Sequence, residues 1–205
     1  MSDERNPSRR EFFRFRKNLV QELGAMALGP FGKGPGRTAP ASLRLLQRPP
    51  GAVAEGQFLS ACTRCGDCIE ACPPRAIQPA PEAAGEARAG TPMIDALRSP
   101  CVMCDDLPCI DACEPGVLQH GLPLRMATAS IDRDACLPWN GQECRLCLDH
   151  CPVPGAMELV EDDGASGPVI EPASCTGCGV CLSVCPAPRN AVRHRPLEER
   201  PFAAL

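Results

Sequence analysis

Apolar residues are spread along the chain in short stretches rather than in long periodic runs. Four of these stretches follow groups of closely spaced cysteines, and each predicts a short strand: residues 76–78, 117–119, 156–160 and 191–193. Residues 79–90, rich in proline, alanine, glycine and glutamate, predict a surface loop. The pattern predicts an α+β chain with little regular secondary structure. No stretch reaches the roughly 18 apolar residues that a membrane-spanning helix needs.

The first 57 residues contain no cysteine and follow a different pattern. Five apolar residues recur there at three- and four-residue steps and would form one stripe of an amphipathic helix: Phe12, Phe15, Leu19, Leu23 and Met26. Residues 1–50 carry ten Lys and Arg against four Asp and Glu, a formal charge of +6. A basic amphipathic helix is typical of a segment that docks on a partner or lies peripherally on an anionic membrane. Residues 29–40, rich in glycine and proline, predict a linker after it.

This N-terminal arm also resembles an export signal. Residues 8–14 read SRREFFR, which is similar to the twin-arginine motif of proteins exported in the folded state. Arg16, Lys17 and Glu22 interrupt the part that such a signal keeps apolar. The arm is therefore interpreted as an export signal, a docking helix or a solvated tail, and both the cytoplasm and the periplasm stay open as its location.

The rest of the chain is acidic and holds all of the cysteines. It carries eleven Arg against twenty-one Asp and Glu, a formal charge of −10, which argues against nucleic-acid binding by this part. Only 3% of residues are aromatic and there is no tyrosine, so apolar burial alone would give a weak core. A chain of this kind needs metal sites or disulfides to stabilise it.

The sixteen cysteines form four quartets with none left over. The first and fourth follow the spacing C-x2-C-x2-C-x3-C-P, whereas the second and third each have one widened gap. The quartets are Cys62, Cys65, Cys68 and Cys72; Cys101, Cys104, Cys109 and Cys113; Cys136, Cys144, Cys147 and Cys151; and Cys175, Cys178, Cys181 and Cys185.

This spacing is typical of [4Fe–4S] clusters. Two-residue gaps let the backbone wrap one corner of a cluster, so three thiolates reach three irons, while the fourth cysteine serves the other cluster of a pair. Eight disulfides would be the alternative in a secreted protein, and zinc would be expected at two C-x2-C pairs separated by a longer loop. The repeated quartets predict four [4Fe–4S] clusters, with all sixteen cysteines as iron ligands.

The quartets define the expected organisation and role. We expect an arm over residues 1–57, a four-cluster domain over 58–195 and a tail over 196–205. No Ser/His/Asp set, carboxylate pair or dinucleotide fingerprint is present, so an electron carrier or electron-transfer subunit is predicted rather than an enzyme. Trp139 is interpreted as a shield for the third quartet's cluster or as core packing, and His150 as a surface histidine.

Beyond these motifs, residues 48–195 resemble the bacterial ferredoxin-type proteins NapG and MauM, of the periplasmic nitrate reductase and methylamine-utilisation systems. The resemblance rests on RPPGA at 48–52, CTRCGDC at 62–68, AGTP at 89–92, PCVMCDDLPC at 100–109, CRLC at 144–147 and CTGCG at 175–179. It implies a ferredoxin-like fold of two pseudo-symmetric two-cluster units. It also implies a relay of electrons from a quinol-oxidising membrane partner toward a terminal oxidoreductase. The similar NapF type implies an alternative role in enzyme maturation, and a zinc-stapled interaction module is a further alternative.

Analogy with other four-cluster ferredoxin subunits predicts which quartets form pairs. It pairs the first quartet with the fourth and the second with the third, and pairing in sequence order is the alternative. Because the last cysteine of a quartet serves the partner's cluster, Cys72→Ser is then expected to damage the cluster nested in the fourth quartet.

Overall fold

The computed structural model describes residue 43, residues 46–201 and residue 203. All of them belong to a unit that spans Ala39–Leu205. The export motif, the amphipathic stripe and the linker that the sequence predicts lie outside the described residues.

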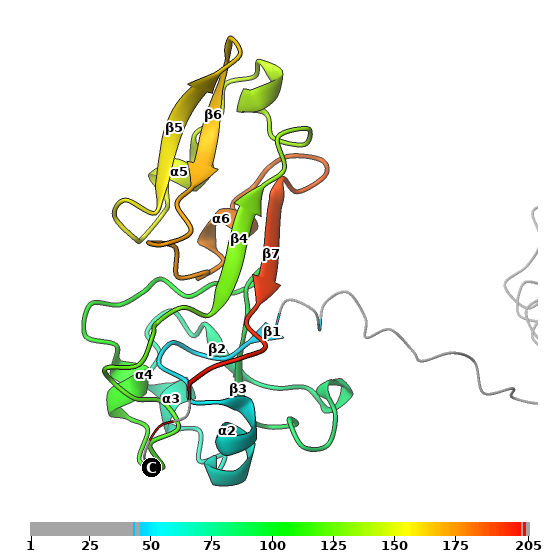
Figure 1. Ribbon diagram of the computed structural model, residues 1–205. Helices are drawn as coiled ribbons and strands as arrows, with labels where there is room; N and C mark the ends of the chain where they lie inside the picture. Colours follow the sequence, from blue (N-terminus) through cyan, green and yellow to red (C-terminus); the bar gives the residue numbers. More distant parts are fainter. Residues whose placement is uncertain (1–42, 44–45, 202, 204–205) are drawn as a thin grey trace, which may run out of the picture. The chain divides into compact units, whose positions relative to one another are not determined.

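The first two quartets surround a three-stranded antiparallel sheet of order β1-β3-β2. Its strands are β1 (Leu46–Gln47), β2 (Ile77–Pro79) and β3 (Pro92–Asp95). The helices of this part are α2 (Glu55–Ala61), α3 (Asp67–Glu70) and α4 (Pro108–Asp111), with the 3-10 helix η2 (Glu82–Ala84) in the segment between β2 and β3 (Figure 1). Helices α3 and α4 carry cysteines, and each is a single turn beginning at a residue with positive φ.

The third and fourth quartets lie with two separate strand pairs. Strand β4 (Ala127–Ile131) pairs with β7 (Val192–Pro196), and β5 (Met157–Asp162) pairs with β6 (Ala165–Ile170), both antiparallel (Figure 1). The one-turn helices are α5 (Leu146–Asp149) and α6 (Val180–Ser183), which contact each other, and η3 (Pro138–Asn140) fills the widened gap of the third quartet. The two-unit layout expected from the sequence has a counterpart here, although the two parts differ in their sheets.

Three of the four strand predictions are confirmed in outline. Residues 76–78 correspond to β2, 156–160 to β5 and 191–193 to β7. Residues 117–119 form only an isolated bridge, Ala52 with Leu118, so that prediction is wrong. This segment does pair with the chain that enters α2, but only over a few residues, since Gly51 at a φ of 70° turns that chain away.

The apolar core is small and includes cysteine side chains. Phe58, Ile77, Ile94 and Leu118 are fully buried together with several thiols of the first two quartets. A second cluster of buried residues lies around the third and fourth quartets. Part of the interior is therefore lined by the groups that would hold metal, as a chain poor in aromatics requires.

A buried arginine ties the start of this unit together. Arg48 is 1% exposed, and its guanidinium pairs with Glu55 at 2.8 Å, donates to Thr91 Oγ1 at 2.7 Å and lies over the Phe58 ring at 4.2 Å. Burial alone would raise the pKa of Glu55, but Arg48, together with Arg88 and Arg200, holds the pKa below its ordinary value. Residues 46–57, which the sequence assigned to the arm, thus supply β1 and most of the chain that leads to Cys62.

The chain keeps its contacts with the fold beyond residue 195, where the sequence predicts the start of a tail. Strand β7 continues to Pro196, and the Leu197 N–H donates to the Met126 carbonyl at 3.0 Å. The Ala54 N–H donates to the carbonyl of Pro201 at 2.8 Å, so the described end of the chain packs beside α2.

Candidate metal centres

The cysteine thiols gather in four sets, each with three members from one quartet and one from another. Set I holds Cys62, Cys65, Cys68 and Cys113; set II holds Cys101, Cys104, Cys109 and Cys72; set III holds Cys136, Cys144, Cys147 and Cys185; set IV holds Cys175, Cys178, Cys181 and Cys151. In every set the cysteine that comes from the other quartet is the last cysteine of that quartet.

Set I forms around the loop that leads into α3. Burial raises the pKa of Cys68 to about 12, and the largest further contribution comes from Cys113, followed by Cys62 and Cys65. Cys65 is exposed, whereas Cys68 is buried. This set therefore lies partly at the surface.

Set II lines an apolar hollow beside the three-stranded sheet. Cys72 meets Cys101, Cys104 and Cys109 there, and the remaining walls are Pro50, Pro73, Pro74, Ala76, Ile77, Leu107 and Pro108. Burial raises the pKa of Cys101 to about 12, although the Met103 N–H donates to its sulfur at 3.4 Å. Low polarity favours the neutral thiol, so a positive metal is needed to keep these sulfurs as thiolates.

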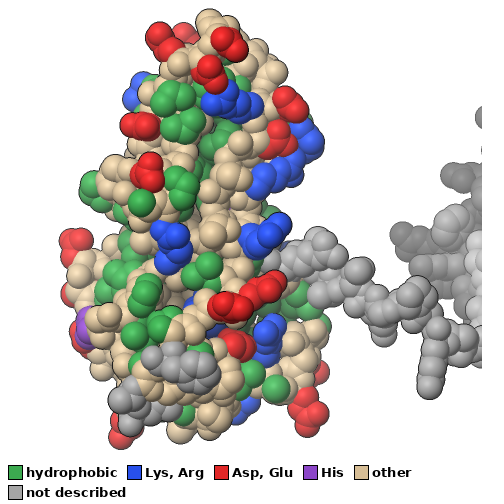
Figure 2. All heavy atoms as spheres, viewed as in Figure 1, with side chains coloured by type: hydrophobic (Ala, Val, Ile, Leu, Met, Phe, Trp, Pro, Cys, Tyr) green, Lys and Arg blue, Asp and Glu red, His purple; other side chains and the backbone are tan. Residues whose placement is uncertain are grey.

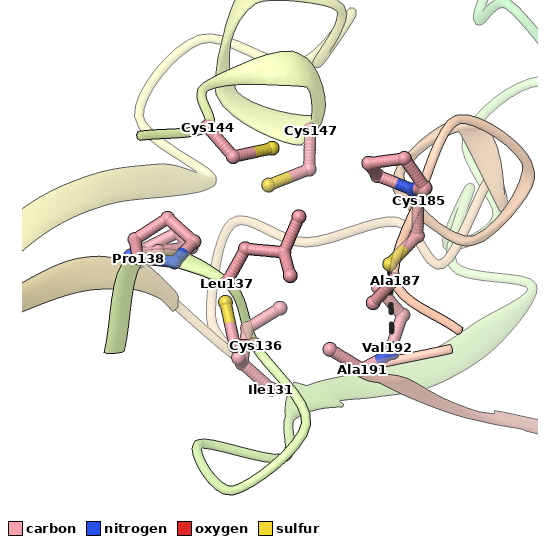
Figure 3. A pocket seen from close by; sticks show the side chains of 12 residues that line it. Ile131, Cys136, Leu137, Pro138, Cys144, Cys147, Cys185, Ala187, Ala191 and Val192 are labelled. Atoms are coloured by element: carbon pink, nitrogen blue, oxygen red, sulfur yellow. Dashed lines mark hydrogen bonds between the residues drawn. The ribbon is translucent and has the colours of Figure 1, made fainter. Parts of the chain in front are cut away.

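Set III surrounds the start of the widened gap in its quartet. Figure 3 shows its four thiols around the side chain of Leu137, with Pro138 and Val192 beside them. Asn140 donates to the carbonyl of Cys136 at 2.8 Å and so closes the turn after the first ligand. The seven-residue gap therefore contains a 3-10 helix, Pro138–Asn140.

Trp139 projects from that turn onto the β5–β6 hairpin. Its indole N–H donates to the Pro168 carbonyl at 3.1 Å, and Gly167 lies so close that any side chain there would collide with the ring. The Arg133 guanidinium covers the ring at 4.0 Å. Pro168 lines the hollow of set III, so Trp139 packs against the outer side of one wall of that hollow. His150 is exposed, as the sequence predicted.

Set IV lies between the β5–β6 hairpin and α6. Cys151 meets Cys175, Cys178 and Cys181 in a hollow whose walls include Val153, Ala156, Met157 and Ile170. Burial raises the pKa of Cys181 to about 12, with smaller contributions from thiols of set IV and from Cys147 of set III. Sets III and IV are therefore neighbours.

The pairing predicted by analogy is wrong, and the alternative of sequence order is what the structure shows. Cys72 lies with the second quartet and Cys113 with the first, while Cys151 and Cys185 are exchanged between the third and fourth. The reason is local: the β2–β3 hairpin returns the chain from Cys72 to Cys101, and the β5–β6 hairpin returns it from Cys151 to Cys175. The exchange of last cysteines was anticipated, but its partners were not.

Backbone N–H groups point at several of these sulfurs. Three of the four last cysteines accept from residues four to six positions later, Ala76 to Cys72 at 3.3 Å, Leu118 to Cys113 at 3.4 Å and Ala191 to Cys185 at 3.5 Å. Such donors favour thiolate and tune the potential of a bound cluster. These residues carry no motif, so sequence reasoning could not find them, although all three lie in stretches for which a strand was predicted.

Two further findings concern the described part of the chain. No three His, Cys, Asp or Glu side chains among those residues converge as ligands of a single metal ion, and the thiols instead surround hollows. None of the described helices has the length and apolar character required to cross a membrane.

Comparisons with known proteins agree with this geometry. The model of a 4Fe-4S dicluster domain matches residues 61–117, which hold every cysteine of sets I and II, and residues 141–188, which hold those of sets III and IV except Cys136. The methylamine utilization ferredoxin-type protein MauM of Methylobacillus flagellatus is 37% identical over 203 residues, covering 94% of this chain and 85% of that protein.

Two Escherichia coli proteins show the same relationship. The ferredoxin-type protein NapG is 34% identical over 197 residues, covering 90% of this chain and 85% of its own. The ferredoxin-type protein NapF is 31% identical over 139 residues, covering 68% of this chain and 79% of its own. No solved structure matches the chain.

Proposed function

The chain belongs to the family of ferredoxin-type 4Fe-4S proteins that includes MauM and NapG, and on that premise we propose that it carries four [4Fe–4S] clusters, one in each thiol set. It is an electron-transfer protein rather than an enzyme. The proposed role is to relay electrons from a quinol-linked or other redox donor to a terminal oxidoreductase.

The observation that carries the proposal is the composition of the four sets. Each set offers four thiols, three from a tight loop and one from the partner quartet, and together the sets use all sixteen cysteines. Four thiolates are the ligand complement of a [4Fe–4S] cluster, and exchange of the last cysteine is the arrangement of two-cluster ferredoxins.

The chain's own residues would do three things for such clusters. The loops orient the thiolates, the proline and aliphatic walls exclude water, and the N–H groups on the sulfurs stabilise negative charge. The clusters, when bound, supply the one-electron chemistry. Burial that raises the thiol pKa values also means that loading with iron must release protons.

Charge supports a basic docking partner. The residues after position 50 have a formal charge of −10, and four thiolate-bound clusters would add about −8. On the face shown in Figure 2, side chains of both signs are interspersed, so no single acidic patch dominates that face. The proposed attraction to a partner is therefore an effect of the total charge, and it should weaken as ionic strength rises.

Metal and sulfide analysis of the full-length protein, purified without oxygen, tests the proposal. We expect about sixteen irons and sixteen acid-labile sulfides per chain, with interacting signals in the EPR spectrum after dithionite reduction. About four zinc ions and no sulfide would contradict it and would identify a zinc-stapled scaffold.

Serine substitutions test the exchange of last cysteines separately. Cys72→Ser and Cys104→Ser are expected to alter the same cluster's EPR signal, because both residues lie in set II. Cys65→Ser is expected to alter a different one. If Cys72→Ser and Cys65→Ser change the same signal, each quartet holds its own cluster and the exchange is wrong.

A further inference from the structure

Sets I and II form one pair of thiol sets and sets III and IV form the other. Two cysteine residues connect the pairs. The N–H of Cys101, in set II, donates to the carbonyl of Cys178, in set IV, at 3.2 Å. Both residues are proposed ligands, so one backbone hydrogen bond joins a ligand of one pair to a ligand of the other. Cys178 also packs into the core cluster that contains Cys72 and Cys109 of set II.

The loop of the fourth quartet is held at this contact by successive carbonyls. The Thr176 carbonyl accepts from the Met126 N–H at 2.7 Å, and the Gly177 carbonyl accepts from the buried Gln47 side chain at 3.0 Å. With the Cys178 carbonyl, three consecutive acceptors are bound by segments that lie outside the third and fourth quartets. We call the contact of residues 176–179 with these segments the seam.

Two glycines allow the seam to close. A Cβ atom on Gly179 would lie 2.7 Å from both the Cβ and the carbonyl oxygen of Ala96, and one on Gly177 would collide with the backbone of Ala127. A Cβ atom does not make non-bonded contacts this short, so the loop can approach this closely only without side chains at these two positions. A side chain at either position would therefore push against the seam.

Burial separates inner sets from outer sets. Sets II and IV each contain two buried cysteines, whereas sets I and III each contain one, and set I includes the exposed Cys65. In set III the residues between Cys144 and Cys147, Arg145 and Leu146, are exposed. The sets that meet at the seam are thus the more enclosed ones, and the outer sets have the surface access that a redox partner needs.

We propose that electrons pass between the four clusters in the order I, II, IV, III. The Cys101–Cys178 contact is the crossing between the two pairs, and Gly177 and Gly179 are its positioning residues. This rests on the proposed function. At each step one electron would pass from the cluster held by one set to the cluster held by the next, with no bond made or broken. Electron tunnelling slows steeply with distance, so the crossing needs the close approach that the glycines permit, and partners would exchange electrons at sets I and III.

The test compares Gly179→Ala with Gly66→Ala in the full-length protein loaded with clusters. Both glycines precede a one-turn helix that carries the third cysteine of its quartet, with φ values of 95° and 93°. Alanine therefore strains both backbones alike. No atom lies within 4 Å of a Cβ placed on Gly66, so only Gly179→Ala also pushes against the seam.

The readouts are iron and sulfide per chain and the EPR spectrum of the fully reduced protein. In the wild type and Gly66→Ala we expect a spectrum that requires spin–spin interaction between the pairs as well as within them. In Gly179→Ala we expect full iron and a spectrum that reduces to two independent pairs. A wild-type spectrum of two independent pairs, or a Gly179→Ala spectrum like the wild type's, overturns the proposed order even though the clusters are present.

A second variant decides the matter if Gly179→Ala loses iron. Gln47→Met keeps the side-chain length but removes the Gln47 donor to the Gly177 carbonyl, which keeps its contact with His194 Nε2 at 3.0 Å, and it adds no atom at the seam. A weaker interaction between pairs with full iron supports the proposal, and an unchanged interaction contradicts it. Absence of iron and sulfide from the wild type would instead refute the proposed function itself, and the wiring with it.

Discussion

The loops of the first and fourth quartets have the same cysteine spacing but opposite surroundings. In both loops the third and fifth residues have positive φ, 60° at Arg64 and 93° at Gly66 in the first, 67° at Gly177 and 95° at Gly179 in the fourth. The backbone that wraps a cluster is thus the same in both. One loop reaches solvent, and the other is enclosed by the seam.

The difference shows which constraint selects the residues between the ligands. Arg64 tolerates a positive φ because its side chain extends over the surface, where its guanidinium donates to the carbonyls of Ala87 and Ala89. Met103 has a φ of 52° at the same position of the second quartet. Positive φ alone therefore does not require glycine there, and Gly177 reflects the close approach of Ala127.

The largest expected effect comes from exchanging these third residues. Gly177→Arg gives the fourth loop the residue of the first, and its side chain would collide with the Ala127 backbone. We expect loss of the clusters of sets III and IV, with iron per chain falling by about half. Metal analysis checks this. The reciprocal Arg64→Gly should keep its full iron content, and equal losses in both variants would contradict the comparison.

A smaller contrast is expected for the middle ligands of the two loops. Cys65 is exposed and Cys178 is buried. Serine at position 65 therefore remains accessible to water, while serine at position 178 leaves a buried hydroxyl beside the seam. Cys178→Ser should lose the cluster of set IV, about four irons, whereas Cys65→Ser should lose about one iron. Iron counts and Mössbauer spectra distinguish the two. The comparison fails if Cys65→Ser is the more damaging.

The anchoring of the two loops should also respond differently to acid. The helix that leads into the first loop is tied by the buried Arg48 to Glu55, whose pKa is lowered in the folded protein. The stability from this pair is fully present above the unfolded pKa of glutamate and is lost as pH falls through the lower folded value. Glu55→Gln, which leaves Arg48 without its partner charge, should destabilise the protein by about 3 kcal/mol at neutral pH.

That difference should shrink as the solution is acidified. Thermal unfolding of wild type and Glu55→Gln across the carboxylate range, followed anaerobically, gives the measurement. The hydrogen bonds on the Thr176 and Cys178 carbonyls contain no carboxylate, so the fourth loop's amide exchange, corrected for intrinsic rate, should change less with pH. A constant difference between the two proteins would contradict the role given to the ion pair.

The smallest effect is expected at the surface of the first loop. Arg64→Ala removes two exposed hydrogen bonds to the segment that carries Ala87 and Ala89, which should cost about 1 kcal/mol or less. Iron content should not change, and amide exchange should rise in residues 86–90. A loss of iron would show that this loop too depends on its surroundings.

The sequence predicted the cysteine chemistry better than its arrangement. Quartet spacing indicates local loop geometry, so the gathering of three thiols from one loop and the exchange of the last cysteine could be anticipated. The choice of partner quartet could not, because it depends on the β2–β3 and β5–β6 hairpins. Only β2 and β5 of those strands gave a signal, while β3 follows a proline- and glycine-rich segment and β6 itself contains Gly167 and Pro168.

The seam residues were equally hidden from sequence reasoning. Gln47 and Ala96 are ordinary residue types in segments without a motif, and they matter only because the fold brings them to the fourth loop. Glycines between the ligands also let N–H groups approach cluster sulfur. The Gly177 N–H does donate to the Cys175 sulfur at 3.4 Å, but the absence of a side chain is explained by Ala127 and Ala96 on the outer side.

Anomalous diffraction at the iron absorption edge, from crystals of the anaerobically purified protein, tests the central claim most directly. The account predicts iron density inside each of the four thiol sets, with Cys72 beside the iron of the second quartet and Cys113 beside that of the first. Iron density that joined the first quartet to the fourth, or four single peaks at the zinc edge, would contradict it.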